Sequence, residues 1–500
     1  MAEPGTYEGG SADLRTGQVE GVAVEGGKFP PVRPTAEAVD ERNEDVVPPA
    51  DLGDLIGSLE PTVDATKLGD LGGGAAGEGV AFVVDTPFGR VVTFTGIPPD
   101  MSGASSENVV FVSGNTFAAF STDGGINFTA LDPTTIFPSA PSFDAAGNPL
   151  DNGLCCDQVI QYEPEIDRFI WLQQFCGTGA NCLQGINMLR IAAASPVDIA
   201  NSNGTAWTYW DFRSAAFGLA GAMDYPDMSL GNSRLNISVD AVGVGLLVFR
   251  IPLSEIAAGA AVNFDFTNPA DSVNAYGGHL SQNTGDELYW AGHINTSRMR
   301  VFSLPESSGT YSWRDIDINS WPNADYSSLA PDGTDWLSFL AGFPGSAVLG
   351  ATRRQVAGTS EAWFAWSAAR GGGFAHPHIQ VISFDTATWA VVDQWQIWNP
   401  DLAFAYPCLA TNADQEVGVS LGWGGGGSFH ANHAVGILGD FVVWFSEASD
   451  ATINRWGDYV TVRRAARSSH FSGIGYSLMQ DPPPATSSTF NPRYTLFGRP

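Results

Sequence analysis

A hairpin-like phrase recurs along most of this chain. In each copy, an aromatic or polar start leads into a short apolar or alternating run, then a turn of Gly, Asn or Asp, then a second run. Repeats of strands at periods of about 40 to 50 residues are typical of β-propellers, in which small antiparallel sheets pack radially and cover one another's faces. The clearest copies are CCDQVIQYEPEIDRFIWLQQF from Cys155, YPDMSLGNSRLNISVDA from Tyr225, YGGHLSQNTGDELYWAGH from Tyr276, YPCLATNADQEVGVSLG from Tyr406 and WGDYVTVRR from Trp456.

The repeat predicts a single all-β domain over residues 79–500, a propeller with four-stranded antiparallel blades. The last repeat offers only three good strands, and a strand from residues 79–97 is available to complete it. This latch gives seven blades; six is the alternative if the first segment is an appendage. The segment Trp321–Pro344 is expected to be an inserted loop that carries Trp336 over one face. After a first blade near residue 105, the blades are expected at about 155–213, 224–267, 276–320, 345–399, 404–447 and 455–500.

The first part of the chain has a different composition. Residues 1–78 hold 16 acidic and 5 basic residues, with few aromatics and no periodic apolar pattern. A segment of this kind cannot bury enough apolar surface to offset the entropy of ordering. The sequence therefore predicts an acidic arm, disordered or loosely attached, that precedes the propeller.

The overall charge limits the partners. The formal net charge is −31, and Lys occurs only at positions 28 and 67. Nucleic-acid backbones and anionic membrane surfaces attract clustered Lys and Arg, so neither is expected as a partner. No run of 18 apolar residues occurs, which predicts that the chain has no transmembrane segment.

The chain has five cysteines, an odd number. Cys176 and Cys182 frame the Gly-rich turn CGTGANC and are predicted to form a disulfide across it. The pairing of the adjacent Cys155 and Cys156 and of Cys408 stays open. We expect an extracytoplasmic protein, secreted or at the cell surface; free buried thiols in a cytosolic protein are the alternative.

Two short motifs resemble those of a known superfamily. Ser121 to Phe128, STDGGINF, fits the pattern S-x-D-x-G-x-x-aromatic and resembles the Asp box of sialidase-like propellers. In that superfamily the box is a structural turn remote from the active centre, so the resemblance implies a fold and no catalytic role. Phe249-Arg250-Ile251-Pro252 is similar to a sialidase motif whose Arg binds the substrate carboxylate. Here it follows the box and ends an apolar run, which favours a structural role for Arg250.

Alignment of the repeats predicts a polar site at one mouth of the central channel. In a propeller the innermost strands start at the same mouth, so equivalent positions converge there. Clustered carboxylates raise one another's pKa and could perform acid/base catalysis or hold a cation. The alternative is that they only satisfy strand ends and buried water. The candidate catalytic residues are Asp157, Asp227, Asp458, Arg455, Tyr459 and His279; Cys408, Tyr276 and Trp456 align at the same level.

Large aromatic rings suggest a ligand. Trp321, Trp336 and Trp423 are expected in loops, where a ring has no packing role and could stack on a sugar. The candidate substrate-binding residues are Trp336, Trp423, Tyr225 and Tyr406. No cofactor or metal is assigned.

These observations predict a non-enzymatic, secreted propeller that binds glycans or a protein partner through the loops at the channel mouth. The alternative is a carbohydrate-active enzyme, a glycoside hydrolase or polysaccharide lyase, with its acidic site at the central channel.

Overall fold

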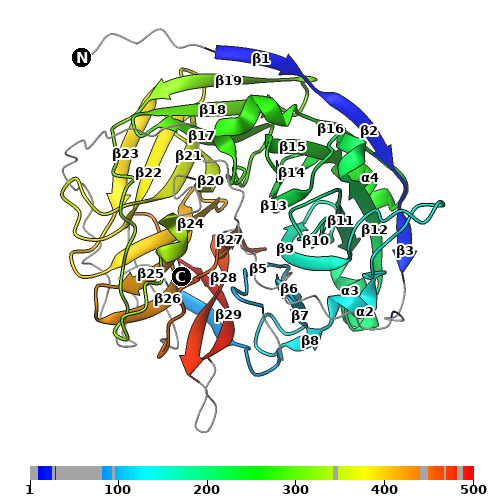
Figure 1. The fold of residues 1–500 in the computed structure, drawn as a ribbon, viewed down its shortest axis with the longest axis horizontal. Helices are drawn as coiled ribbons and strands as arrows, with labels where there is room; N and C mark the ends of the chain where they lie inside the picture. Colours follow the sequence, from blue (N-terminus) through cyan, green and yellow to red (C-terminus); the bar gives the residue numbers. More distant parts are fainter. Residues whose placement is uncertain are drawn as a thin grey trace.

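The computed structural model describes residues 9–24, 29, 81–92, 96–341, 347–439, 449–466, 469–480 and 488–499. Within these ranges, seven antiparallel sheets are arranged radially around a central channel (Figure 1). The predicted seven-bladed propeller is therefore confirmed. None of the helices in the described ranges has the length and hydropathy that a membrane-spanning helix needs.

The blades follow one another along the chain, and each begins with its innermost strand. The first four contain β5 (Ser102–Ser105), β6 (Val110–Gly114), β7 (Phe117–Ser121) and β8 (Thr129–Leu131); β9 (Leu154–Glu163), β10 (Arg168–Phe175), β11 (Met188–Ala194) and β12 (Trp207–Arg213); β13 (Met223–Leu230), β14 (Arg234–Ala241), β15 (Gly245–Pro252) and β16 (Val262–Phe266); and β17 (Glu287–Asn295), β18 (Arg298–Pro305) and β19 (Thr310–Asp317).

The last three contain β20 (Val348–Val356), β21 (Thr359–Ala368), β22 (His378–Asp385) and β23 (Val391–Ile397); β24 (Ala403–Thr411), β25 (Val417–Gly425) and β26 (Phe429–Ile437); and β27 (Thr461–Arg464), β28 (His470–Gln480) and β29 (Ser488–Gly498). The helical elements are short: α2 (Pro133–Ile136), α3 (Pro196–Ser202), α4 (Leu253–Ala258) and the 3-10 turns η2 (Ser214–Phe217), η3 (Pro269–Ala275) and η4 (Ser338–Ala341).

The apolar core lies between the blades. Because each sheet packs against a neighbour on both faces, the inner strands are buried along almost their whole length instead of alternating. Between the first two blades, the ring of Phe111 lies 5.0 Å from that of Trp171 and 5.1 Å from that of Trp207. Such contacts hold neighbouring blades together and thereby fix the inner strands that line the channel.

The ring closes as predicted. β4 (Ala81–Pro87) pairs antiparallel with β29 and forms the outer strand of the last blade, with Thr86 opposite Tyr494. The last sheet thus combines one strand from before the first blade with three from the end of the chain. Closure by pairing distant segments leaves no open edge between the first and last blades.

A belt of three strands surrounds part of the outer rim. β1 (Gly9–Asp13), β2 (Arg15–Val19) and β3 (Val22–Val24) pair with β19, β16 and β12, the outer strands of three successive blades (Figure 1). Over residues 9–24 the structure therefore differs from the expected disordered arm. Main-chain pairing to a sheet edge needs no apolar pattern, which explains why residues 9–24 show no recognisable strand pattern. Residues 1–8, 25–28 and 30–80 lie outside the described part.

Two glycines in the belt explain its close fit. A Cβ on Gly10 would lie 2.4 Å from the ring of Trp313, and one on Gly17 would lie 2.2 Å from the ring of Phe264. At these two positions, the main chain of the belt therefore packs directly against a large ring of an outer strand.

Candidate functional site

The inner strands bring several of the predicted residues together. The Tyr459 hydroxyl lies 3.4 Å from Oδ2 of Asp157, across the channel from the last blade to the second. The rings of Tyr225, His279 and Tyr459 contact one another with centroids 4.9 to 5.3 Å apart. Asp227 accepts a 3.0 Å hydrogen bond from the main-chain NH of Leu280. The alignment of repeats thus located residues that converge.

The local backbone turns two tyrosines into this region. Tyr225 and Tyr406 both precede a proline and have positive φ angles of 53° and 55°. Each lies where the register of its strand shifts against the next strand. A bulge of this kind redirects a side chain, and a left-handed bulky residue persists only where the surroundings hold it.

Four buried aspartates and one buried arginine lie beside these rings. We call them the acidic cluster: Asp100, Asp157, Asp224, Asp458 and Arg455. Nη2 of Arg455 is 4.0 Å from Oδ2 of Asp458. The main-chain NH of Asp458 donates a 2.9 Å hydrogen bond to Oδ1 of Asp100. Gln174 donates a 2.6 Å hydrogen bond to Asp224. All five members of the cluster are buried.

Burial controls the protonation of the cluster. Desolvation raises the pKa of Asp458 to about 7, the charge of Asp100 adds to this effect, and Arg455 opposes it. Burial likewise raises the pKa of Asp100 and of Asp224. One cation therefore faces several carboxyl groups with raised pKa values, and Asp458, with a pKa of about 7, is able to donate a proton near neutral pH.

Sequence reasoning missed Asp100 and Asp224. Asp224 directly precedes the aligned Tyr225, so a wider alignment window would have included it. Asp100 precedes β5 in the first blade, where the chain reads PPDMSGAS and has no aromatic start. No signal in the sequence pointed to Asp100.

The predicted sugar-stacking residues need a correction. Trp336, Trp423, Tyr225 and Tyr406 are 0%, 2%, 4% and 1% exposed, so they present no ring face to solvent. Trp423 lies in β25 and not in a loop. Trp336 does lie in the inserted loop, but its ring packs perpendicular to that of Trp456 at 6.0 Å, at the start of the last blade. The predicted Trp321 is also fully buried.

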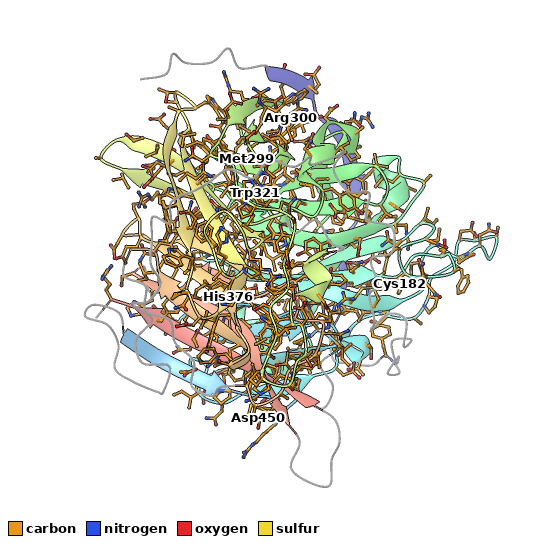
Figure 2. All side chains as sticks on the ribbon, turned by 60° about the vertical axis from the view of Figure 1, so that its left-hand side comes forward. Cys182, Met299, Arg300, Trp321, His376 and Asp450 are labelled. Carbon is orange, nitrogen blue, oxygen red and sulfur yellow. A yellow bond between two sulfur atoms is a disulfide. The ribbon has the colours of Figure 1, made fainter. Side chains whose placement is uncertain are left out.

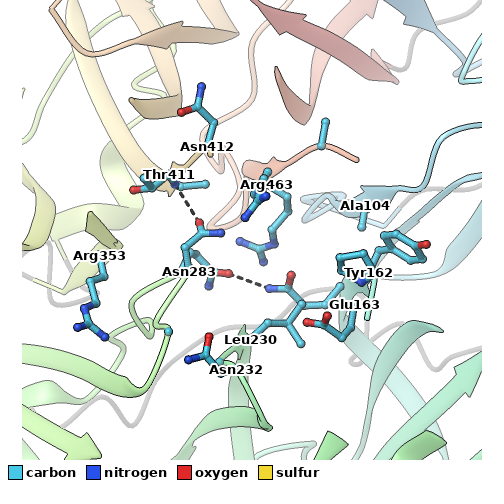
Figure 3. Close-up of a pocket in the computed structure, with 18 of the residues that line it drawn as sticks. Ala104, Tyr162, Glu163, Leu230, Asn232, Asn283, Arg353, Thr411, Asn412 and Arg463 are labelled. Carbon is cyan, nitrogen blue, oxygen red and sulfur yellow. Dashed lines mark hydrogen bonds between the residues drawn. The ribbon is translucent and has the colours of Figure 1, made fainter. Parts of the chain in front are cut away.

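The open cavity lies where the inner strands end. We call it the channel pocket; its volume is about 790 Å³ (Figure 3). Polar and charged side chains predominate among those that line it. They include Glu107, Gln161, Tyr162, Glu163, Glu165, Asn232, Gln282, Asn283, Asp286, Arg353, Arg354, Gln355, Thr411, Asn412, Gln415, Arg463 and Arg464.

Hydrogen bonds between blades fix the amide side chains of the channel pocket. Nε2 of Gln161 donates to Oε1 of Gln282 at 2.8 Å and to the main-chain oxygen of Met228 at 2.7 Å. Oδ1 of Asn283 accepts from the main-chain NH of Thr411 at 2.9 Å. Figure 3 draws the bond of Asn283 to Thr411. These donors and acceptors are held in place before any ligand binds.

Arginines of the channel pocket are paired with carboxylates. Arg353 donates a 2.6 Å hydrogen bond to Asp286 and another of 2.6 Å to the main-chain oxygen of Thr284. Nη2 of Arg463 lies 3.7 Å from Oδ1 of Asp227. Burial raises the pKa of Glu163, an effect that its hydrogen bond from the Glu165 NH opposes.

A second, much smaller cavity lies beside the rings of His279 and Tyr459. Its volume of about 10 Å³ is the space of a single water, and its lining includes Asp227, His279, Tyr459 and Arg463. Arg463 also lines the channel pocket. The predicted Asp227, His279 and Tyr459 therefore line a small cavity that shares Arg463 with the channel pocket, but they do not line the channel pocket itself. Sequence reasoning missed the pocket itself because it aligned strand starts, although polar residues such as Gln161 and Thr411 recur at strand ends.

The remaining motifs have structural roles or stay apart. Arg250 is buried, donates to the main-chain oxygen of Pro305 at 2.9 Å and pairs with Asp265 at 3.3 Å, so it joins two blades outside the channel.

Cys176 and Cys182 form the predicted disulfide, Cys155 and Cys156 form a second, and Cys408 is free and buried. Among the described histidines, cysteines and carboxylates, the one group close enough to share an ion consists of cysteines.

Comparisons with known proteins add little. No family model matches the chain, and a search of curated proteins finds no relative. Solved structures that align include a protein of unknown function from Dyadobacter fermentans, with 10% identity, 85% of this chain and 100% of that chain covered, and a TM-score of 0.37. The intramolecular trans-sialidase from Ruminococcus gnavus aligns with 12% identity, 64% and 89% coverage and a TM-score of 0.37. The α-L-arabinofuranosidase from Fusarium graminearum aligns with 8% identity, 84% and 98% coverage and a TM-score of 0.33. Matches this distant carry no argument about function.

Proposed function

We propose that this propeller binds a glycan in the channel pocket and does not cleave it. The observation that carries the proposal is an open cavity of about 790 Å³ whose amide and guanidinium groups are already fixed by hydrogen bonds. Cavities of this size suit small ligands, and fixed polar groups give orientation and specificity. Sugar hydroxyls both donate and accept, so they match a lining of Gln, Asn, Arg and Glu side chains.

A panel of soluble oligosaccharides, neutral and acidic, tests this proposal by calorimetric titration. We expect at least one class to bind, and Arg464→Gln to weaken its binding because Arg464 is an exposed guanidinium in the lining. Arg298→Gln is the matched control, since Arg298 is an exposed arginine at the start of β18, outside the lining of the channel pocket. Binding of no saccharide, or equal weakening by both variants, would contradict the proposal. Capture of a protein ligand at the pocket instead would favour the partner-binding form of the hypothesis.

A specific observation favours a second candidate, a carbohydrate-active enzyme. The pKa of about 7 for Asp458 is suited to a group that donates a proton at neutral pH. An assay of polysaccharides for new reducing ends or unsaturated products tests it. Activity that Asp458→Asn abolishes, with stability retained, would replace the binding function with catalysis.

We also propose that the protein is secreted or held at the cell surface. Two disulfides support this proposal because such bonds persist in oxidising compartments.

A further inference from the structure

The second blade contains a cluster of four cysteines, which we call the sulfur cluster: Cys155, Cys156, Cys176 and Cys182. Cys155 and Cys156 lie at the start of β9, and Cys176 directly follows β10. Cys182, which Figure 2 labels, lies in the loop before β11. The Sγ atoms of Cys155, Cys176 and Cys182 lie within 4.8 Å of one another. The two disulfides are therefore neighbours, and a sulfur of one can reach a sulfur of the other.

We propose that the sulfur cluster is a redox centre that takes two electrons from an external dithiol and moves the remaining disulfide inward, to Cys155 and Cys176. Thiol–disulfide exchange requires that a thiolate attack one sulfur of a disulfide through a mixed-disulfide intermediate. The short distances between the sulfur atoms satisfy this requirement without movement of a strand.

The transfer begins at the disulfide of the loop. One thiolate of the external dithiol attacks Sγ of Cys182, and the bond to Cys176 breaks with its electron pair on Cys176. The second thiol of the reagent then displaces Cys182, which takes a proton, and the reagent leaves as a disulfide. The thiolate of Cys176 attacks Sγ of Cys155, and Cys156 departs as a thiolate and takes a proton. The dithiol loses two electrons, and the protein ends with one disulfide and two thiols.

Exposure sets the direction of this transfer. Residues 179–181 of the loop are exposed and Cys182 is 8% exposed, whereas Cys155 and Cys156 are fully buried. A small dithiol therefore meets the loop first. Main-chain hydrogen bonds from Gly177 to Cys182, 2.8 Å, and from Gly179 to Gln184, 2.7 Å, hold the loop once its disulfide opens. Cys176 consequently stays within reach of Cys155.

The centre adjoins the acidic cluster. Sγ of Cys155 lies 3.6 Å from the main-chain oxygen of Gln174, whose side chain binds Asp224, and Cys156 directly precedes Asp157. The disulfide between Cys155 and Cys156 thus lies next to residues that contact or belong to the acidic cluster.

Peptide mapping tests the transfer in the wild-type protein. Trypsin cleaves after Arg90, Arg168 and Arg190, so Cys155 and Cys156 fall in one peptide and Cys176 and Cys182 in the next. The oxidised protein gives two unlinked peptides. After treatment with one equivalent of dithiothreitol, acid quenching and alkylation, we expect the two peptides to be joined, with Cys156 and Cys182 alkylated. Reduction of Cys176 and Cys182 while the Cys155–Cys156 bond stays intact would overturn the proposal, as would no reduction at all.

Cys156→Ser provides an independent test that needs no reductant. It leaves three cysteines in reach of one another, and we expect a mixture in which part of Cys155 is bonded to Cys176. Complete alkylation of Cys155 beside an intact Cys176–Cys182 bond would overturn the proposal. Cys408→Ser is the control and should leave both maps unchanged, because Cys408 lies in β24, apart from the cluster.

Discussion

At one end of the central channel Asp458 lies 4.0 Å from Arg455, and at the other end Asp286 accepts a 2.6 Å hydrogen bond from Arg353. Both are carboxylate–guanidinium pairs, yet the pKa values of the two carboxyl groups are shifted in opposite directions. Burial raises the pKa of Asp458, whereas the hydrogen bond from Arg353 lowers the pKa of Asp286, whose side chain is 74% exposed. The comparison shows that burial can keep the pKa of a carboxyl group raised even beside a guanidinium, whereas the pKa of an exposed carboxyl group follows its hydrogen bond to the cation.

Removing the single cation of the acidic cluster should produce the largest effect. We expect Arg455→Met to lower the free energy of unfolding by about 3 kcal/mol at alkaline pH, because buried carboxylates lose their compensating charge. At acidic pH the loss should be smaller, since the carboxyl groups then hold protons. Urea unfolding of the variant at both pH values measures this difference.

The matched control is Arg298→Met. Arg298 pairs with Asp317, and both side chains are exposed. Its loss should stay within about 0.5 kcal/mol at either pH. A loss for Arg455→Met that does not depend on pH would show that the side chain acts through packing alone, for example against the ring of Phe339 at 4.3 Å.

The next prediction concerns the pH dependence of stability. The folded-state pKa of Asp458, about 7, is above its ordinary value of 3.8, so the folded state binds this proton more tightly than the unfolded state does. Its contribution to stability is therefore fully present below about pH 4 and is lost as the pH rises through about 7. The melting temperature of the wild type should fall across this range, and that of Asp458→Asn should fall less. Parallel curves for the two proteins would contradict this assignment.

The smallest effect is expected at the exposed pair. The pKa of Asp286 is below its ordinary value, so its contribution is present above the unfolded pKa and is lost as the pH falls through the folded pKa. Because the side chain is exposed, Asp286→Asn should cost only about 0.5 kcal/mol near neutral pH. Salt titration of its melting temperature checks this value, since screening should remove most of it.

The sequence predicted the fold better than the site. Repeated hairpins identify a propeller because strand and turn patterns are local, and the incomplete last repeat required a latch such as β4. The three strands of the belt were not predicted. They pair with sheet edges through the main chain, and small residues such as Gly10 and Gly17 at the contact form no recognisable strand pattern. Alignment of the repeats brought Asp157 and Tyr459 together correctly.

Alignment could not predict burial. At the strand starts, the inserted loop packs Trp336 against Trp456, a contact between distant segments that no local pattern encodes. The sequence therefore predicted a site where the inner strands start, whereas the channel pocket lies where they end.

The central claim is that a saccharide binds in the channel pocket and not at the acidic cluster. Saccharide binding by one variant from each end of the channel tests this claim most directly. Glu163→Gln and Asp458→Asn both remove a carboxylate while keeping its shape, the first in the lining of the channel pocket and the second in the acidic cluster. With the saccharide selected from the panel, calorimetry should show Glu163→Gln weakening binding by about tenfold, the loss of a charged hydrogen bond, and Asp458→Asn leaving it unchanged. Loss of binding in Asp458→Asn with full binding in Glu163→Gln would contradict the account and place the ligand at the acidic cluster.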